Sequence, residues 1–296
     1  MKKRQILLAT LAIFGAFGVS LAGCHSGQQP AIDHPRLDPG VAVQDVTFYS
    51  ASLKRQMPYR VFLPEKLIPS QKLPVVYLLH GGNGGFRDWS NYSDVAQYAA
   101  PGRSGGLILV MPEGAFSYYQ NAALKPEDKY EDYLVNDLIR DVETRFPVAK
   151  DRENRAIIGI SMGGFETAKL ALSRPELFGF VGAISPSIDV CQRRFHLKEW
   201  WRLTAIFGPV ASKTRQSANP FALVQTANPA ITPFIYLTAG DKEPLREPNT
   251  RFAARLKARG FSYEFRTKPG GHDWGEWDSQ LPGCFDSLLS HIKPTR

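Results

Sequence analysis

Ala156-Ile157-Ile158-Gly159-Ile160-Ser161-Met162-Gly163-Gly164 is the stretch that decides the fold. Its first five residues predict a short strand that is buried on both faces of a sheet, and residues 164–173 predict a helix after it. The stretch contains the pattern G-x-S-x-G, in which a serine occupies a very tight turn between a strand and a helix. A helix N-terminus beside that serine favours a developing negative charge. We therefore predict that Ser161 is an exposed nucleophile.

Strands and helices alternate on both sides of this stretch, and residues 46–49 and 59–63 read as a pair of edge strands. Further strands are predicted at residues 74–79, 107–111, 180–184, 234–237 and 263–266, and further helices at 88–99, 130–146, 249–259 and 285–292. This alternation favours an α/β fold with one mainly parallel sheet and helices on both faces. Residues 186–230, rich in Trp, Arg and Pro, interrupt it, and we expect an insertion over one edge of the sheet.

His272 is the best placed of the six histidines to serve as the base that a serine nucleophile requires. It lies in a Gly-rich loop directly after the last predicted strand, and such loops hold the sites of parallel sheets. An acid that orients His272 should follow the strand between Ser161 and His272. Asp241 and Glu243 both lie there, so the choice between the two acids is open at this point.

Two places in the sequence can supply backbone donors for the oxyanion of acyl transfer. His80 ends an apolar strand and precedes Gly81-Gly82-Asn83-Gly84-Gly85, a run that can direct N–H groups at an oxyanion. We expect one donor from Gly82 and the other from Met162, which follows the serine. A phosphate-binding loop is disfavoured because no Lys-Ser/Thr pair follows the glycines. His80 itself is expected to hold the loop.

Residues from about 45 to 292 resemble an esterase family that includes feruloyl esterases, S-formylglutathione hydrolases, tributyrin esterases and secreted mycolyltransferases. The resemblance is carried by Tyr77-Leu78-Leu79-His80-Gly81-Gly82, Gly159-Ile160-Ser161-Met162-Gly163-Gly164 and Gly270-Gly271-His272-Asp273-Trp274. It implies an α/β-hydrolase fold. It also implies an acid three residues after a glycine, as in G-x-x-D-x-L. Gly240 and Glu243 match this spacing, so the resemblance favours Glu243 over Asp241, with Glu in place of the commoner Asp.

The function implied by the resemblance is hydrolysis of a carboxylic ester through an acyl-enzyme on Ser161, without a metal or organic cofactor. The substrate would be a small-molecule or carbohydrate-linked ester. One alternative is an acyltransferase that passes the acyl group to a sugar or another alcohol, and a second is a non-catalytic surface binding protein. Four tryptophans could form an aromatic platform for the substrate or could serve in packing, and packing is favoured. They are Trp200, Trp201, Trp274 and Trp277.

The N-terminus has the layout of an export signal. A basic start, Met1-Lys2-Lys3-Arg4, precedes an apolar run that ends in Leu21-Ala22-Gly23-Cys24. This tetrapeptide resembles the lipobox of bacterial lipoproteins, which implies a lipid on Cys24 and attachment to a membrane on the periplasmic or cell-surface side. We therefore expect a signal peptide at residues 1–23, a flexible tether at 24–44 and the esterase domain at 45–296.

Composition limits the remaining possibilities. The chain has 296 residues and a formal net charge of +8, but its basic residues are dispersed, so no nucleic-acid partner is expected. Three cysteines are too few for a disulfide-built scaffold. Cys191 and Cys284 could pair in an oxidising compartment, although two unpaired, buried thiols are the favoured alternative.

Overall fold

The computed structural model describes residues 32–68, 70–104, 106–193 and 197–292. The predicted signal peptide, Cys24 and the first part of the predicted tether lie outside these ranges. Within them, no helix combines the length and the apolar character that crossing a membrane requires.

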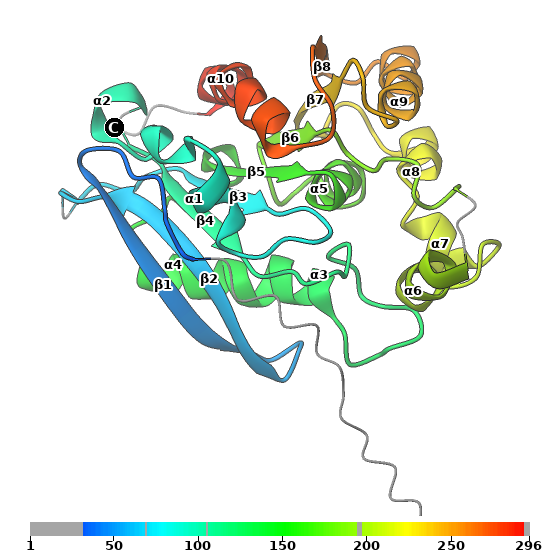
Figure 1. The fold of residues 1–296 in the computed structure, drawn as a ribbon, viewed down its shortest axis with the longest axis horizontal. Helices are drawn as coiled ribbons and strands as arrows, with labels where there is room; N and C mark the ends of the chain where they lie inside the picture. The colour runs from blue at the N-terminus through cyan, green and yellow to red at the C-terminus, as the bar shows by residue number, and fades with distance from the viewer. Residues whose placement is uncertain (1–31, 69, 105, 194–196, 293–296) are drawn as a thin grey trace, which may run out of the picture. The chain divides into compact units, whose positions relative to one another are not determined.

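Eight strands form one sheet in the order β1-β2-β4-β3-β5-β6-β7-β8 (Figure 1). Neighbouring strands from β3 to β8 pair in parallel, whereas β1 and β2 pair antiparallel to their neighbours. All eight predicted strands are present, and the prediction of a mainly parallel sheet is confirmed. One detail was wrong, because β2 lies between β1 and β4 and is not an edge strand. The bounds are β1 (Val41–Ser50), β2 (Arg55–Pro64), β3 (Val75–Leu79), β4 (Ile108–Pro112), β5 (Arg155–Ile160), β6 (Phe180–Ile184), β7 (Phe234–Gly240) and β8 (Tyr263–Lys268).

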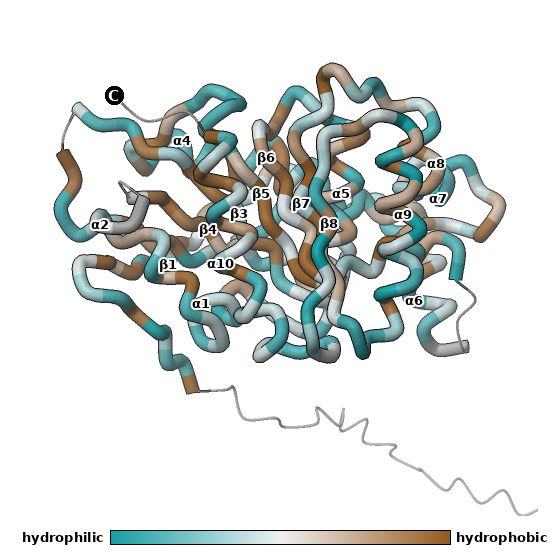
Figure 2. The backbone as a smooth tube through the Cα atoms, turned by 90° about the horizontal axis from the view of Figure 1, so that it is seen from above, coloured by the Kyte–Doolittle hydropathy of each residue, from teal (hydrophilic) through white to brown (hydrophobic). Residues whose placement is uncertain are grey.

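Helices cover both faces of the sheet, as predicted. The hydrophobic core accordingly has two parts: α4, α5 and α9 contribute to one, and α1 and α10 to the other. Figure 2 shows hydrophobic residues concentrated along the central strands between these layers. The bounds are α1 (Asp88–Tyr92), α2 (Pro101–Ser104), α3 (Tyr130–Asp132), α4 (Ile139–Arg145), α5 (Met162–Ser173), α6 (Leu197–Phe207), α7 (Lys213–Ser217), α8 (Pro220–Thr226), α9 (Arg246–Ala258) and α10 (Trp274–His291).

Three helices differ from their predicted form. The helix expected at 88–99 ends at Tyr92 and is followed by a 3₁₀ turn, Val95–Tyr98. The helix expected at 130–146 contains a π-helical segment, Tyr133–Leu138, between α3 and α4. The last helix begins well before residue 285. Helix α10 contains Pro282 and begins after Asp273, whose carboxylate caps it.

The ordered domain begins earlier than residue 45, so the predicted end of the tether at residue 44 was wrong. Strand β1 begins at Val41, and Asp33 already contacts the domain. The guanidinium of Arg60, only 3% exposed, lies 2.7 Å from Asp33 and 2.6 Å from Asp45. A buried cation of this kind requires paired carboxylates. This pairing joins distant residues, and therefore no local sequence pattern indicates it.

The segment at 186–230 does not cover an edge of the sheet, which is where it was expected. It contains α6, α7 and α8, and α8 packs against α5 and α9 on one face of the sheet. Helix α6 is joined to the loop after β4, because the N–H of Ala123 donates to the carbonyl of Ile206 over 2.8 Å. The insertion therefore adds a second layer of helices next to that loop.

Cys191 and Cys284 are both buried and unpaired, which confirms the favoured alternative. Cys191 belongs to the part of the core that contains α5 and α9, whereas Cys284 belongs to the part that contains α10. The sheet separates these two parts, so the thiols have no route to each other in the folded chain.

Candidate active site

Ser161 occupies the sharp turn between β5 and α5 that the sequence predicts. Its backbone has φ +52° and ψ −109°, a conformation that residues other than glycine rarely adopt. Glycines make the turn possible. A Cβ on Gly159 would lie 2.3 Å from the carbonyl carbon of Gly163, and a Cβ on Gly163 would lie 2.5 Å from the carbonyl oxygen of Leu79. Strand β5, helix α5 and the end of β3 therefore approach one another closely, and the Ser161 side chain at the turn is partly exposed.

Ser161, His272 and Glu243 form one hydrogen-bonded chain. His272 Nε2 lies 2.9 Å from Ser161 Oγ, and His272 Nδ1 lies 2.8 Å from Glu243 Oε2. A carboxylate accepts only, so the Nδ1–H donates to Glu243 and leaves Nε2 free to accept the serine proton. The Glu243 side chain is fully buried and that of His272 is 31% exposed. Trp277 supports the imidazole with an edge-on contact at 5.0 Å between ring centroids.

Of the two acids that the sequence offers, Glu243 is the one that contacts His272. Its second oxygen, Oε1, accepts the N–H of Gly240 over 2.9 Å, which fixes the carboxylate at the end of β7. Asp241 instead accepts the N–H of Gly270 over 3.0 Å. Asp241 thus fastens the loop that carries His272, and it makes no contact with the imidazole.

Gly82 and Met162 lie against each other beside Ser161. Met162 is the first residue of α5, so its N–H has no partner within the helix. A Cβ on Gly82 would lie 4.0 Å from that of Met162 and 3.1 Å from the ring of Phe116. The structure thus brings together, in the lining of one cavity with Ser161, the two residues predicted as backbone donors.

His80 holds the Gly-rich loop, as predicted. It is fully buried. Its Nε2 accepts the N–H of Gly114 over 2.9 Å, which leaves the Nδ1–H to donate to the carbonyl of Gly81 over 2.7 Å. With these two hydrogen bonds the imidazole joins the loop after β3 to the loop after β4.

A cavity of about 480 Å³ opens at Ser161 and His272, and part of its lining was missed in the sequence. Phe116 and Tyr118 come from the loop after β4. That loop lies at the carboxyl end of a parallel strand, and this position is the feature of the sequence from which its place at the cavity could have been predicted.

Trp274 and Trp277 also line the cavity, whereas Trp200 and Trp201 are exposed and lie outside its lining. The four tryptophans therefore do not form one platform.

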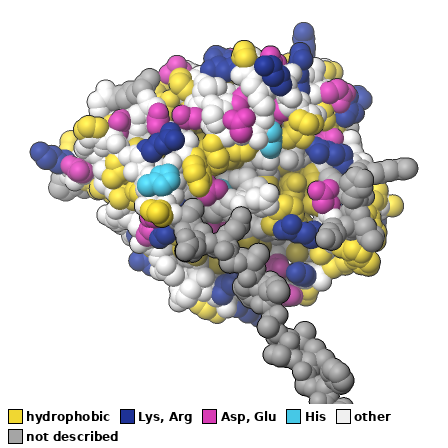
Figure 3. All heavy atoms as spheres, viewed as in Figure 1, with side chains coloured by type: hydrophobic (Ala, Val, Ile, Leu, Met, Phe, Trp, Pro, Cys, Tyr) yellow, Lys and Arg dark blue, Asp and Glu magenta, His cyan; other side chains and the backbone are white. Residues whose placement is uncertain are grey.

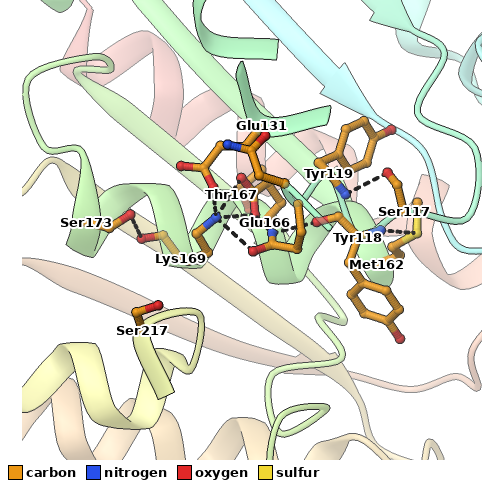
Figure 4. A network of polar contacts seen from close by, with 12 residues as sticks. Ser117, Tyr118, Tyr119, Glu131, Met162, Glu166, Thr167, Lys169, Ser173 and Ser217 are labelled. Carbon is orange, nitrogen blue, oxygen red and sulfur yellow. Dashed lines mark hydrogen bonds and ion pairs between the residues drawn. The ribbon is translucent and has the colours of Figure 1, made fainter. Parts of the chain in front are cut away.

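A buried polar network fixes Tyr118 at the cavity (Figure 4). The N–H of Tyr118 contacts the sulfur of Met162 over 3.3 Å. The side chain of Gln120 donates to the carbonyl of Tyr118 over 2.8 Å and also to Glu166. Burial raises the pKa of the Glu166 carboxyl well above its usual range, and the ammonium of Lys169, 3.2 Å away, opposes that rise. Helix α5 thereby positions both the serine and the opposite wall of the cavity.

Comparison with known proteins identifies the family. The family model described as "Putative esterase" matches residues 50–288. The chain belongs to this esterase family. Two curated relatives are an acetyl esterase of Caldicellulosiruptor saccharolyticus (25% identity, 83% of this chain, 97% of the relative) and an endo-1,4-beta-xylanase/feruloyl esterase of Xylanibacter ruminicola (26% identity, 83% of this chain, 31% of the relative).

The fold is shared with solved structures of serine hydrolases. A fluorophosphonate-binding serine hydrolase of Staphylococcus aureus superposes with a TM-score of 0.75 over 84% of this esterase and 98% of that chain, at 24% identity. The family and the fold together confirm three predictions: the resemblance to this esterase family, the α/β-hydrolase architecture, and the class of enzyme, a carboxylic-ester hydrolase.

Proposed function

We propose that this esterase hydrolyses its substrate in two steps through an acyl-enzyme on Ser161. The observation that carries the proposal is the hydrogen-bonded chain from Ser161 through His272 to the buried Glu243. A serine, a base that accepts its proton and an acid that orients the base are the three groups that this mechanism requires.

In the first step, Ser161 Oγ attacks the ester carbonyl while His272 Nε2 takes the hydroxyl proton. The N–H groups of Gly82 and Met162 stabilise the oxyanion, and each contributes about 3 kcal/mol. Glu243 stabilises the imidazolium without accepting its proton. His272 then protonates the leaving alcohol. In the second step water, activated by the same imidazole, releases the acid from Ser161.

Ser161→Ala tests the mechanism. We expect hydrolysis of p-nitrophenyl acetate to fall by about 10⁴-fold or more, with unchanged thermal unfolding, because only the nucleophile is removed. Mass spectrometry after quenching with a slow ester should show one acyl group on the wild-type enzyme and none on the variant. Ser217→Ala, at an exposed serine of α7, is the matched control and should retain full activity. Activity of Ser161→Ala near that of wild type would refute the mechanism and favour a non-catalytic binding role.

We further propose short acyl or phenolic esters on carbohydrates as substrates. The names of the two curated relatives support these classes, and the aromatic side chains of Phe116, Tyr118 and Trp274 line the cavity that would receive them. A panel of acetylated xylan, feruloyl esters and short nitrophenyl esters tests the choice. The same panel with added sugar acceptors distinguishes hydrolysis from transfer, because a sugar ester that accumulates in preference to free acid would favour the acyltransferase.

Export and lipid anchoring through Cys24 are also proposed, and they are supported by the sequence of the N-terminus alone. Cells that express the chain should carry it in the membrane fraction, with incorporation of labelled fatty acid. Cys24→Ala should release it from that fraction. Label that persists in the variant would refute Cys24 as the site of lipidation.

A further inference from the structure

A second cavity, of about 240 Å³, adjoins the catalytic one. Phe116 lines both cavities and therefore forms the wall between them. The second cavity lies between the loop after β4 and helix α6. Its apolar lining includes Ala205 and Ile206, and its cations are Lys125 and Arg202.

Arg202 is stacked on the ring that separates the two cavities. Its guanidinium carbon lies 3.7 Å from the centroid of Phe116. A guanidinium stacked in this way keeps its N–H donors in its own plane, where they match the two oxygens of a carboxylate. Among the residues that the structure describes, neither Arg202 nor Lys125 forms an ion pair. Both cations are therefore available to a bound anion.

The other charge on this cavity is already balanced. Asp128 belongs to the lining, but Arg55 lies 3.7 Å from its carboxylate. On the face of the molecule that Figure 3 shows, basic and acidic side chains are interspersed, whereas Lys125 and Arg202 have no acidic partner in the part of the chain that the structure describes. Two unpaired cations beside an apolar wall thus give the cavity a net positive charge and affinity for a negative group.

The cavity is built on a fixed loop. His80 holds the N–H of Gly114, and the hydroxyl of Ser117 donates to the carbonyl of Gly114 over 2.6 Å. Ala115 between them has φ +46°, a conformation that such contacts must impose. The bond from Ala123 to Ile206 joins α6 to the same loop. Phe116 and Arg202 are therefore positioned before any substrate arrives.

We propose that the second cavity is a subsite for a carboxylate carried by the substrate, on the part of the ester that extends past Phe116. Arg202 binds the carboxylate with paired N–H groups, and Lys125 adds a second positive charge. The preferred substrates are then esters that bear a free acid group near the scissile bond. This inference rests on the proposed function, because it takes Ser161 as the centre from which the substrate extends.

Two pairs of esters of matched size test the subsite, one for each side of the scissile bond. The acyl pair is 4-nitrophenyl hydrogen glutarate and 4-nitrophenyl pentanoate, and the alcohol pair is 4-acetoxybenzoate and 4-acetoxybenzamide. Wild-type enzyme should favour the charged member of one pair in kcat/KM. Arg202→Gln should lower kcat/KM for that member about tenfold, the equivalent of about 1.4 kcal/mol, and lower that of its neutral counterpart much less. The preference should also decline with added salt, because both cations are exposed.

Matched variants separate this effect from a general change in charge or folding. Arg251 is another exposed arginine over a phenylalanine, Phe221 at 5.5 Å, and it does not line either cavity. Arg251→Gln should keep the preference for the charged ester. Arg202→Lys should retain part of it, because the charge stays while the paired donors are lost. Equal kcat/KM of the wild-type enzyme for the charged and the neutral ester, in each of the two pairs, would overturn the subsite. An equal loss of kcat/KM for the charged and the neutral ester in Arg202→Gln would also overturn it. The Ser161 mechanism would stand in either case, since it is tested by the neutral esters.

Discussion

Glu276, in the first turn of α10, is a second carboxyl group close to the proposed triad acid. It is 5% exposed. Burial raises its pKa to about 7, and the negative charge of Glu243 contributes to the rise. The side chain of Gln280 donates to one of its oxygens. The other oxygen has no hydrogen-bond partner among the described residues. These surroundings suit a neutral carboxyl group and disfavour a carboxylate.

The raised pKa sets the direction of the pH effect. Between the ordinary value of 4.5 and about 7, the folded chain holds a proton on Glu276 that the unfolded chain releases. The proton on Glu276 therefore adds its full contribution to the free energy of unfolding below pH 4.5. This contribution declines as the pH rises to 7, and it does not change further above pH 7. The slope is about 1.4 kcal/mol per pH unit, so the whole loss is about 3 kcal/mol.

Glu276→Gln replaces the neutral carboxyl group by a neutral amide of the same shape. Relative to wild type, its free energy of unfolding should rise by about 2–3 kcal/mol between pH 5 and pH 8, because the variant has no proton to lose there. Urea denaturation followed by tryptophan fluorescence at several pH values measures this difference. Glu247→Gln, at an exposed residue of α9, is the control and should show no trend. A difference between Glu276→Gln and wild type that is constant with pH would refute the reasoning.

The remaining predictions concern the triad acid and the tight turn. Glu243→Gln should lower kcat by about 10³- to 10⁴-fold, because the imidazole loses the partner that sets its tautomer, whereas Asp241→Asn should lower it less than about tenfold. Steady-state kinetics on a neutral ester compare the two, and equal losses would contradict the assignment of Glu243. Gly163→Ala should prevent folding or lower the melting temperature strongly, since its Cβ would lie 2.5 Å from the carbonyl oxygen of Leu79. Gly102→Ala, with open space around its Cβ, should melt like wild type.

Local patterns were sufficient to predict the strands and the catalytic turn. The buried strands are short apolar runs, and the G-x-S-x-G stretch requires particular residues within five positions. His272 could be predicted because glycines and a preceding strand mark its loop. The choice of Glu243 over Asp241 required the family spacing, since both carboxylates lie within the same turn. The hydrogen bond from His272 Nδ1 to Glu243 then shows which acid is in position.

Features that depend on distant contacts were not predicted. Phe116 and Tyr118 reach the cavity because His80 and the Gln120–Glu166 pair hold their loop, and both His80 and Glu166 are distant from that loop in the sequence. The start of the domain was placed too late for the same reason, because Asp33 is ordered by Arg60. The insertion was placed at a sheet edge because its composition shows only that it is irregular, and not what it packs against.

The backbone of Ser161 limits how this enzyme can be improved. A non-glycine residue at φ +52° and ψ −109° costs about 1–3 kcal/mol of folding free energy. Selection for heat resistance acting on this position would favour glycine, which would remove the proposed nucleophile. If the proposed mechanism holds, the serine is retained at a cost in folding free energy. Stabilised descendants that remain active must therefore gain their extra stability at other positions in the molecule.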